Sequence, residues 1–188
     1  MQPELRIAVP RWVDDSVDWN RVHATDDDRA GVAIALARRN VAEGTGGPFG
    51  AAVFDSASGR IVSAGVNLVV PLNNSSLHAE IVAFMLAQAR LGRYSLGDDG
   101  GRYELVTSCE PCAMCLGATL WSGVHRVVCC ATGDDARGLA FDEGPVFAES
   151  WSYLDARGIE IVRGVRREEA RAVMKAYRDV DGVIYNAT

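Results

Sequence analysis

Two short stretches decide how the rest of this sequence is interpreted: His78-Ala79-Glu80 and Pro111-Cys112-Ala113-Met114-Cys115. The first is followed by Ile81, Phe84 and Met85 at helical spacing, so it is expected to open a helix. The second begins with a proline, which suits a helix start because its missing N–H is not needed there. Two helix starts that face each other would bring one histidine and two cysteines together.

This arrangement of residue types predicts a zinc site. Cys112 and Cys115 are three residues apart on the first turn of a helix, so their sulfurs share one face. The free N–H groups and the helix dipole favour thiolates there, and the thiolate is the form that binds metal. With His78 the set has three protein ligands, which leaves one position of a tetrahedral zinc open for water.

An open position is typical of a catalytic zinc, which lowers the pKa of bound water to about 7. Glu80 is therefore expected to move protons rather than to bind the metal, and the expected cofactor is one zinc ion per chain. The combination of H-x-E with P-C-x-x-C is typical of zinc-dependent deaminases.

A structural interpretation of the same cysteines is the main alternative. Cys109, Cys112 and Cys115 form a three-cysteine ladder that, with a later cysteine, could hold a structural zinc or an iron–sulfur cluster. This leaves His78 and Glu80 without a role, so we favour the catalytic interpretation.

Length and charge narrow the class of protein. The chain has 188 residues, 48% of them hydrophobic, which fits one domain with a substantial core. The net charge of −6 argues against a protein that grips nucleic-acid phosphates, since such proteins usually present a basic surface. We therefore expect a small-molecule substrate and no nucleic-acid partner.

The cysteines and the apolar runs indicate a cellular location. The five cysteines are Cys109, Cys112, Cys115, Cys129 and Cys130. An odd number so close together makes a poor disulfide framework and suits a reducing compartment. No stretch approaches the roughly 20 apolar residues that span a bilayer, and the sequence does not open with a secretory pattern. We expect a cytoplasmic protein with no membrane partner.

The order of predicted elements indicates an α/β fold. Helices are expected over residues 26–40, 78–91, 112–121, 147–157 and 166–179, and strands over 51–55, 60–67, 103–108, 126–131 and 159–163. Thr25 is expected to cap the first helix. Strand–helix–strand successions imply parallel pairs. The expected architecture is a three-layer α/β/α sandwich around a mixed five-stranded sheet, with 132–146 as a long functional loop.

The sequence resembles the cytidine deaminase superfamily and, within it, the bacterial guanine deaminases. The matching segments are Gly47 to Val53, Asn67, Leu77 to Glu80, Thr107 to Ala118, Trp121, Ala140 to Pro145 and Gly182 to Asn186. The metal motif is shared by the whole superfamily, whereas Trp121, the Phe141-Asp142 pair and the end of the chain favour the guanine branch. The resemblance covers residues from about 28 to the end and implies a cytidine deaminase-like fold.

By this resemblance, guanine would lose its 2-amino group as ammonia and become xanthine, a step of purine metabolism. Ammeline or a related amino-triazine is a second candidate substrate. The alternatives are a cytosine or nucleoside deaminase, a tRNA adenosine deaminase, and a non-enzymatic interaction protein stabilised by zinc.

The resemblance also implies which residues meet the substrate. Substrate-binding residues would be Phe49, Asn67, Ala79, Trp121, Asp142 and Tyr185, with Glu143 beside Glu80 as a catalytic residue. Phe49 and His78 would flank the ring, Asn67 would hydrogen-bond it and Trp121 would border it. Phe49 and Trp121 could instead be packing residues, and Asn67 could stabilise a turn. Which carboxylate points inward, Asp142 or Glu143, stays open.

Both ends of the chain are expected to have separate tasks. Residues 1–25 are expected to be an N-terminal extension, packed on the domain or on a partner subunit, because Trp12 and Trp19 need cover. Residues 26–188 would form the catalytic domain. Its last segment, 180–188, has apolar residues where a chain end is usually polar, so it must dock on some surface. By the resemblance, that segment would cap an active site. The resemblance implies a homodimer, in which this tail could be exchanged between subunits.

Overall fold

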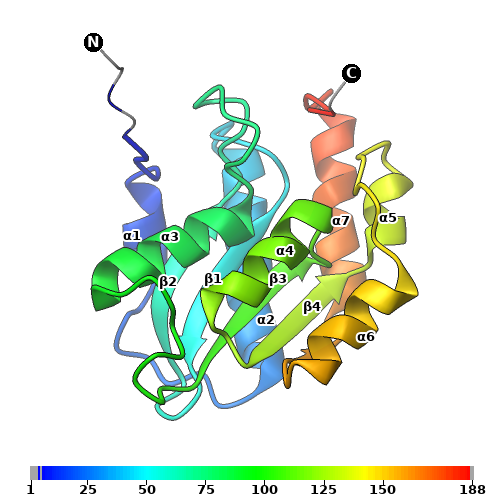
Figure 1. Ribbon diagram of the computed structural model, residues 1–188. Helices are drawn as coiled ribbons and strands as arrows, with labels where there is room; N and C mark the ends of the chain where they lie inside the picture. Colours follow the sequence, from blue (N-terminus) through cyan, green and yellow to red (C-terminus); the bar gives the residue numbers. More distant parts are fainter. Residues whose placement is uncertain (1–3, 5, 187–188) are drawn as a thin grey trace.

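Five strands form one mixed sheet in the computed structural model, which describes residue 4 and residues 6–186. They are β1 (Gly50–Asp55), β2 (Arg60–Val66), β3 (Tyr103–Cys109), β4 (Arg126–Ala131) and β5 (Glu160–Val162), in the spatial order β2-β1-β3-β4-β5. β1 runs antiparallel to β2 and β3, whereas β3, β4 and β5 are parallel (Figure 1). The predicted mixed five-stranded sheet is confirmed.

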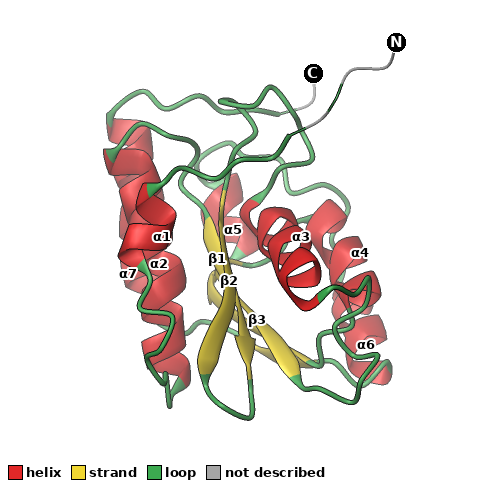
Figure 2. Ribbon diagram, turned by 90° about the vertical axis from the view of Figure 1, so that its left-hand side faces the viewer, coloured by secondary structure: helices red, strands yellow, loops and turns green. Residues whose placement is uncertain are grey.

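Helices cover both faces of the sheet, which gives the predicted three layers (Figure 2). One layer consists of α1 (Trp12–Ser16), α2 (Asp26–Ala42) and α7 (Arg167–Asp179). The other consists of α3 (Ala79–Leu91), α4 (Ala113–Ser122) and α6 (Ala148–Ala156). Thr25 caps α2 as expected, since its side chain accepts a hydrogen bond from the Asp28 N–H.

The sequence predicts one long loop over residues 132–146, but the structure contains a short helix in this segment. It opens with α5 (Gly133–Arg137), which a capping box formed by Thr132 and Asp135 begins. A helix of five residues is too short to show an apolar period, so periodicity could not indicate it.

One glycine in β2 places the start of α3 against the sheet. A Cβ at Gly65 would lie 2.3 Å from the Ala79 carbonyl oxygen and 2.6 Å from the Ala83 nitrogen. The missing side chain therefore lets the first turn of α3 approach the backbone of β2. That first turn contains Glu80, so its position depends on this contact.

The N-terminal extension packs on its own chain, which was one of the two expected outcomes. Trp12, Val13 and Val17 are buried in the same apolar cluster as Leu36 and Phe54. The division of the chain at residue 25 stays a prediction. Residues 1–3 and 5 of the extension and 187–188 of the tail lie outside the described residues.

Buried charges hold the end of β3 that lies away from Cys109. The Glu104 carboxylate is almost fully buried and pairs with Arg29 and Arg126, and Arg126 also binds Asp26 through both carboxylate oxygens. These charges compensate one another, so we assign them to the fold.

In the part of the chain that the structure describes, no helix is long and apolar enough to cross a membrane.

Candidate active site

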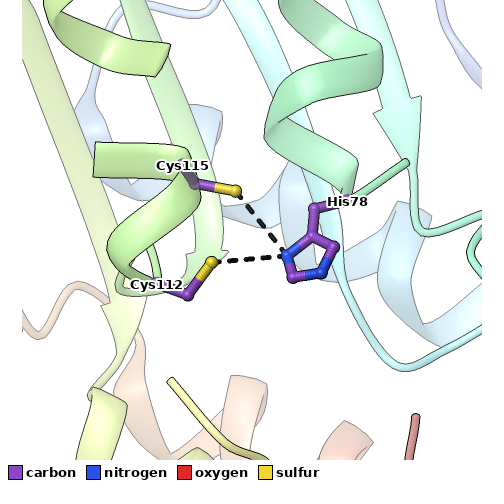
Figure 3. Close-up of side chains that lie close together, drawn as sticks. All are labelled: His78, Cys112 and Cys115. Carbon is purple, nitrogen blue, oxygen red and sulfur yellow. Dashed lines mark hydrogen bonds between the residues drawn. The ribbon is translucent and has the colours of Figure 1, made fainter. Parts of the chain in front are cut away.

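Two helix starts meet at the carboxyl end of β3, as the sequence predicted. His78 is the N-cap of α3 and Cys112 is the N-cap of α4, with Cys115 one turn further along. The Nδ1 of His78 lies 3.5 Å from the Cys112 sulfur and 3.7 Å from the Cys115 sulfur (Figure 3). All three potential ligand atoms lie within 4.8 Å of one another.

These distances fit a zinc ion. With Zn–N near 2.0 Å and Zn–S near 2.3 Å, tetrahedral geometry separates nitrogen from sulfur by about 3.5 Å. The other cysteine of the predicted ladder does not join the group: the Cys109 thiol faces the Thr132 carbonyl oxygen at 3.4 Å. The group therefore suits one metal ion with three protein ligands rather than a cluster.

The electrostatics of the group favour a bound cation. The hydrogen bond from Cys115, and then that from His78, lower the pKa of the Cys112 thiol to about 4 despite its burial. The pKa of Cys115 is raised well above its usual value, first because it keeps the proton of that hydrogen bond and then because it is buried. Cys112 is thus a thiolate at neutral pH, the form that a metal requires.

Glu80 lies beside the metal group without belonging to it. Its carboxylate is only 6% exposed, accepts a hydrogen bond from the Thr107 hydroxyl at 3.3 Å, and lies 3.5 Å from the Cys115 sulfur. Burial, and then the negative charge of Cys112, raise the pKa of Glu80. A carboxyl group whose pKa is shifted toward neutrality can take up and release protons during a reaction.

The metal group opens into a cavity of about 340 Å³. Eight residues predicted for the site line it: Phe49, Asn67, His78, Glu80, Cys112, Asp142, Glu143 and Tyr185. They come from segments distributed from residue 49 to residue 185, so the fold brings together most of the predicted site.

Two predicted substrate-binding residues lie elsewhere. Trp121 is at the end of α4 with 81% of its surface exposed, and it does not line the cavity. The expectation that it borders the substrate is therefore wrong for the cavity of its own chain, because the C-terminal end of α4 points away from the metal group. Ala79 is fully buried beneath the cavity wall, against β2.

The two neighbouring carboxylates of the long loop differ in environment. Glu143 is 8% exposed, and burial, followed by the charge of Cys112, raises its pKa to about 8. Asp142 is exposed, and its carboxylate accepts a hydrogen bond from the Gly144 N–H within the loop. Both residues line the cavity, and Glu143 is therefore the buried carboxylate of the pair.

The end of the chain folds over the cavity. The Tyr185 ring packs against Phe141 at 5.2 Å and against His78 at 6.1 Å, measured between ring centroids. The Asn186 amide accepts from the Asp142 N–H at 2.9 Å and donates to the Ala140 carbonyl at 2.6 Å. The tail is therefore bound to the loop that carries Glu143.

Several cavity residues received no role from the sequence: Ser75, Glu110, Met114, Phe141 and Asn186. Phe141 and Asn186 stand inside segments that match the guanine deaminases, and this was the available signal. Ser75 lies in a polar loop without any pattern, so only the structure could place it.

Comparison with known proteins identifies the family. The cytidine and deoxycytidylate deaminase zinc-binding region matches residues 24–131, and the chain belongs to this family. A guanine deaminase from Bacillus subtilis (strain 168) is 40% identical over 117 residues, which cover 62% of this chain and 71% of that protein.

Solved structures agree with the family in sequence and in fold. NE0047 in complex with 2,6-diaminopurine is 45% identical and superimposes with a TM-score of 0.90 over 96% of each chain. A guanine deaminase from Nitrosomonas europaea is 43% identical, with a TM-score of 0.90 over 95% of this chain and 98% of that one. A variant of NE0047 has been solved in complex with 8-azaguanine. The cytidine deaminase-like fold is thereby confirmed.

Proposed function

We propose that this protein is a guanine deaminase, a zinc-dependent aminohydrolase that converts guanine and water into xanthine and ammonia. The observation on which the proposal depends is the cavity itself: the metal group and Glu80 face a space for a small ligand, and the tail lines one side of it. The relatives at 40–45% identity include guanine deaminases, and NE0047 binds purines with an amino group.

The chemistry divides between the metal and the protein. When bound to His78, Cys112 and Cys115, zinc lowers the pKa of water and so supplies a nucleophile near neutral pH. Glu80 would take one proton from the attacking water and pass it to a ring nitrogen. When the C–N bond breaks, a second proton, lost from the same oxygen, would pass through Glu80 to the departing amine. Glu143, with a pKa of about 8, exchanges protons with the amine from the other side of the cavity.

Substrate recognition falls to the remaining cavity walls. Phe49 and His78 flank the purine ring, and Phe49 is held by an edge-on contact with Phe141 at 5.1 Å. The Asn67 side-chain N–H₂ is buried and lacks a hydrogen-bond partner among the described residues, so it suits an acceptor on the ring. Tyr185 covers the ring from the tail side, and Asp142 holds the tail through its backbone N–H.

The position of the tail at the cavity favours a free base over the alternative substrates. Tyr185 and Asn186 line the cavity, so the ribose of a nucleoside or a tRNA strand would have to displace them. The net charge of −6 also opposes the approach of tRNA. We therefore propose that the protein acts without a nucleic-acid partner. A small amino-triazine such as ammeline fits the same space.

A substrate panel tests this proposal. We expect ammonia release to be fastest with guanine when guanine, ammeline, cytosine, adenine, cytidine, guanosine and tRNA are compared at equal concentration. The purified holoenzyme is assayed by coupled detection of ammonia, with zinc content measured in parallel. Activity confined to nucleosides or to tRNA would overturn the assignment of the substrate.

Removing residues 183–188 is expected to lower kcat/KM for guanine by about tenfold or more, because the cavity then opens to water. The deletion breaks the two hydrogen bonds of Asn186 and removes the cover that Tyr185 provides. Removing only residues 187–188 is the matched control, and it should leave kcat/KM within about twofold of the full chain. Equal kcat/KM for both deletions would refute a closing role of the tail.

We also propose a homodimer formed through the exposed face of α4 and α6. Large apolar side chains on these helices are exposed, among them Met114, Trp121, Phe147 and Tyr153. A groove of about 280 Å³ lies between the two helices, and Tyr153 lines it. Several large exposed apolar side chains on neighbouring helices favour an interface. The tail could be exchanged between the subunits of this dimer, as the resemblance implies.

Replacing Trp121 by glutamate is expected to convert this dimer into a monomer, because a charge would be buried at the interface. Val22→Glu is the matched control, since Val22 is a large apolar side chain that is also exposed and belongs to the N-terminal extension rather than to α4 or α6. Light scattering coupled to size-exclusion chromatography measures the mass of both variants. A dimer that persists in Trp121→Glu would argue against this interface.

Two further proposals concern the setting of the reaction. All five cysteines are free and buried, which suits a reducing compartment such as the cytoplasm. The reaction belongs to the degradation of purines, since it removes an amino nitrogen from the base.

We also propose that the chain divides into an N-terminal extension, residues 1–25, and a catalytic domain, residues 26–188, whose last segment, 180–188, is the tail.

A further inference from the structure

A buried asparagine in α2 holds two walls of the cavity together. Asn40 has no exposed surface, and its Nδ2 donates to the carbonyl oxygens of Gly47 and Asn67, both at 2.9 Å. Gly47 belongs to the turn before β1, which carries Phe49, whereas Asn67 follows the last residue of β2. One side-chain amide therefore connects two segments that are remote in sequence and that both face the substrate.

The contact between these segments is too close for side chains. A Cβ at Gly46 would lie 2.0 Å from the Asn67 carbonyl oxygen and 2.6 Å from the Asn40 Nδ2. A Cβ at Gly47 would lie 2.7 Å from the Tyr185 hydroxyl. The turn thus brings its bare backbone against Asn67, and Asn40 supplies the hydrogen bonds of this junction.

A chain of hydrogen bonds links Asn40 to the N-terminal extension. The Asn40 Oδ1 accepts from the Thr45 hydroxyl at 2.8 Å, and that hydroxyl accepts from the Trp12 Nε1 at 3.1 Å. Trp12 is buried in the core, and the Arg39 guanidinium lies over its ring at 5.2 Å.

The direction of this chain orients the Asn40 amide. An indole N–H can only donate, so Thr45 must accept from Trp12 and is left to give its own hydrogen to Asn40. Asn40 then presents its oxygen to Thr45 and its N–H₂ to the two carbonyls. A rotated amide would place an oxygen against both carbonyl oxygens and lose these two bonds.

We propose that Asn40 is a positioning residue for substrate binding, and that the extension takes part in substrate binding by orienting Asn40 through Trp12 and Thr45. This inference deepens the proposed function, on which it rests. Asn67 is the residue through which the effect reaches the substrate. Loss of the chain therefore weakens the binding of the base, whereas the metal group and Glu80 keep their places.

The first test replaces Trp12 by phenylalanine, which keeps the ring in the core and removes only the N–H. A neutral hydrogen bond is worth about 1 kcal/mol, so we expect KM for guanine and Kd for 8-azaguanine to rise about threefold to tenfold. The value of kcat should stay within about twofold. Trp19→Phe is the matched control: it makes the same chemical change in the same extension, and the Trp19 ring contacts Arg90 instead. It should leave both constants unchanged.

Thr45→Val is the second variant, and it should raise the same constants if Trp12→Phe does not fold. A double-mutant cycle with Asn67→Ala separates positioning from general destabilisation. If the chain acts through Asn67, Trp12→Phe should have no further effect on Kd in the Asn67→Ala background. The inference is wrong if KM and Kd are unchanged in both Trp12→Phe and Thr45→Val. It is also wrong if Trp12→Phe keeps its full effect on Kd in the Asn67→Ala background. A different result would contradict only the proposed function: the wild-type protein does not deaminate guanine, but the double-mutant cycle still gives the expected result for the Kd of 8-azaguanine.

Discussion

Replacing Glu80 by glutamine is expected to lower kcat/KM for guanine about 1,000-fold while the protein still binds about one zinc ion per chain. Glutamine has nearly the same shape, so the Thr107 hydroxyl keeps a partner and the fold is preserved. The amide can neither take up nor release a proton near neutral pH. The loss of kcat/KM therefore measures proton transfer by Glu80. General acid–base catalysis typically accelerates a reaction by about 100- to 10,000-fold.

Glu149→Gln is the matched control for this experiment. Both carboxylates lie in the first turn of a helix, but Glu149 is exposed at the start of α6. Its substitution should leave kcat/KM within about twofold. Zinc content, measured by mass spectrometry of the metal, decides between two causes of an inactive Glu80→Gln. If zinc is lost together with activity, Glu80 is a ligand and its assignment as proton carrier is wrong.

Replacing Cys112 by alanine is expected to have the second large effect, the loss of both zinc and activity. Only His78 and Cys115 would remain as ligands, and two protein ligands do not complete a catalytic zinc site. Zinc supplies several kcal/mol of transition-state stabilisation, so kcat/KM should fall about 1,000- to 10,000-fold. The thiol of Cys112 also has a pKa lowered to about 4, so the variant removes the thiolate of the group.

Cys130→Ala makes the same chemical change at a buried cysteine outside the cavity. This variant should keep its zinc and most of its activity. A strong chelator should inactivate the wild-type protein, and added zinc should restore turnover. Stoichiometric zinc in Cys112→Ala, or full activity in the chelated protein, would exclude the three-ligand metal site.

The metal group could be predicted because each half of it is local. The spacing of Cys112 and Cys115 puts both sulfurs on one side of a helical turn, whatever the rest of the chain does. His78 and Glu80 flank the first residue of a helix, so both can face a site beyond its end. The only non-local step was that the two helix starts meet, and the resemblance to a known family supported it.

The substrate wall could be predicted only in part. Phe49, Asn67 and Tyr185 line the cavity as expected, whereas Trp121 does not. The resemblance marks Trp121 as a single matching residue after the segment Thr107 to Ala118, but a match in sequence does not state which way a side chain faces. Packing of α4 against its neighbours decides that, and it leaves the Trp121 ring exposed.

The sequence by itself determined the strands, the long helices and the two local halves of the metal group, His78 with Glu80 and Cys112 with Cys115. All of these depend on periodicity, caps and spacing within about a dozen residues, which the chain encodes locally. The tertiary structure alone decided that Glu143 rather than Asp142 is buried, that Asn186 binds the loop beside the cavity, and that Trp12 reaches Asn67 through Thr45 and Asn40. Each of these contacts joins residues remote in sequence, and its existence depends on how whole elements pack.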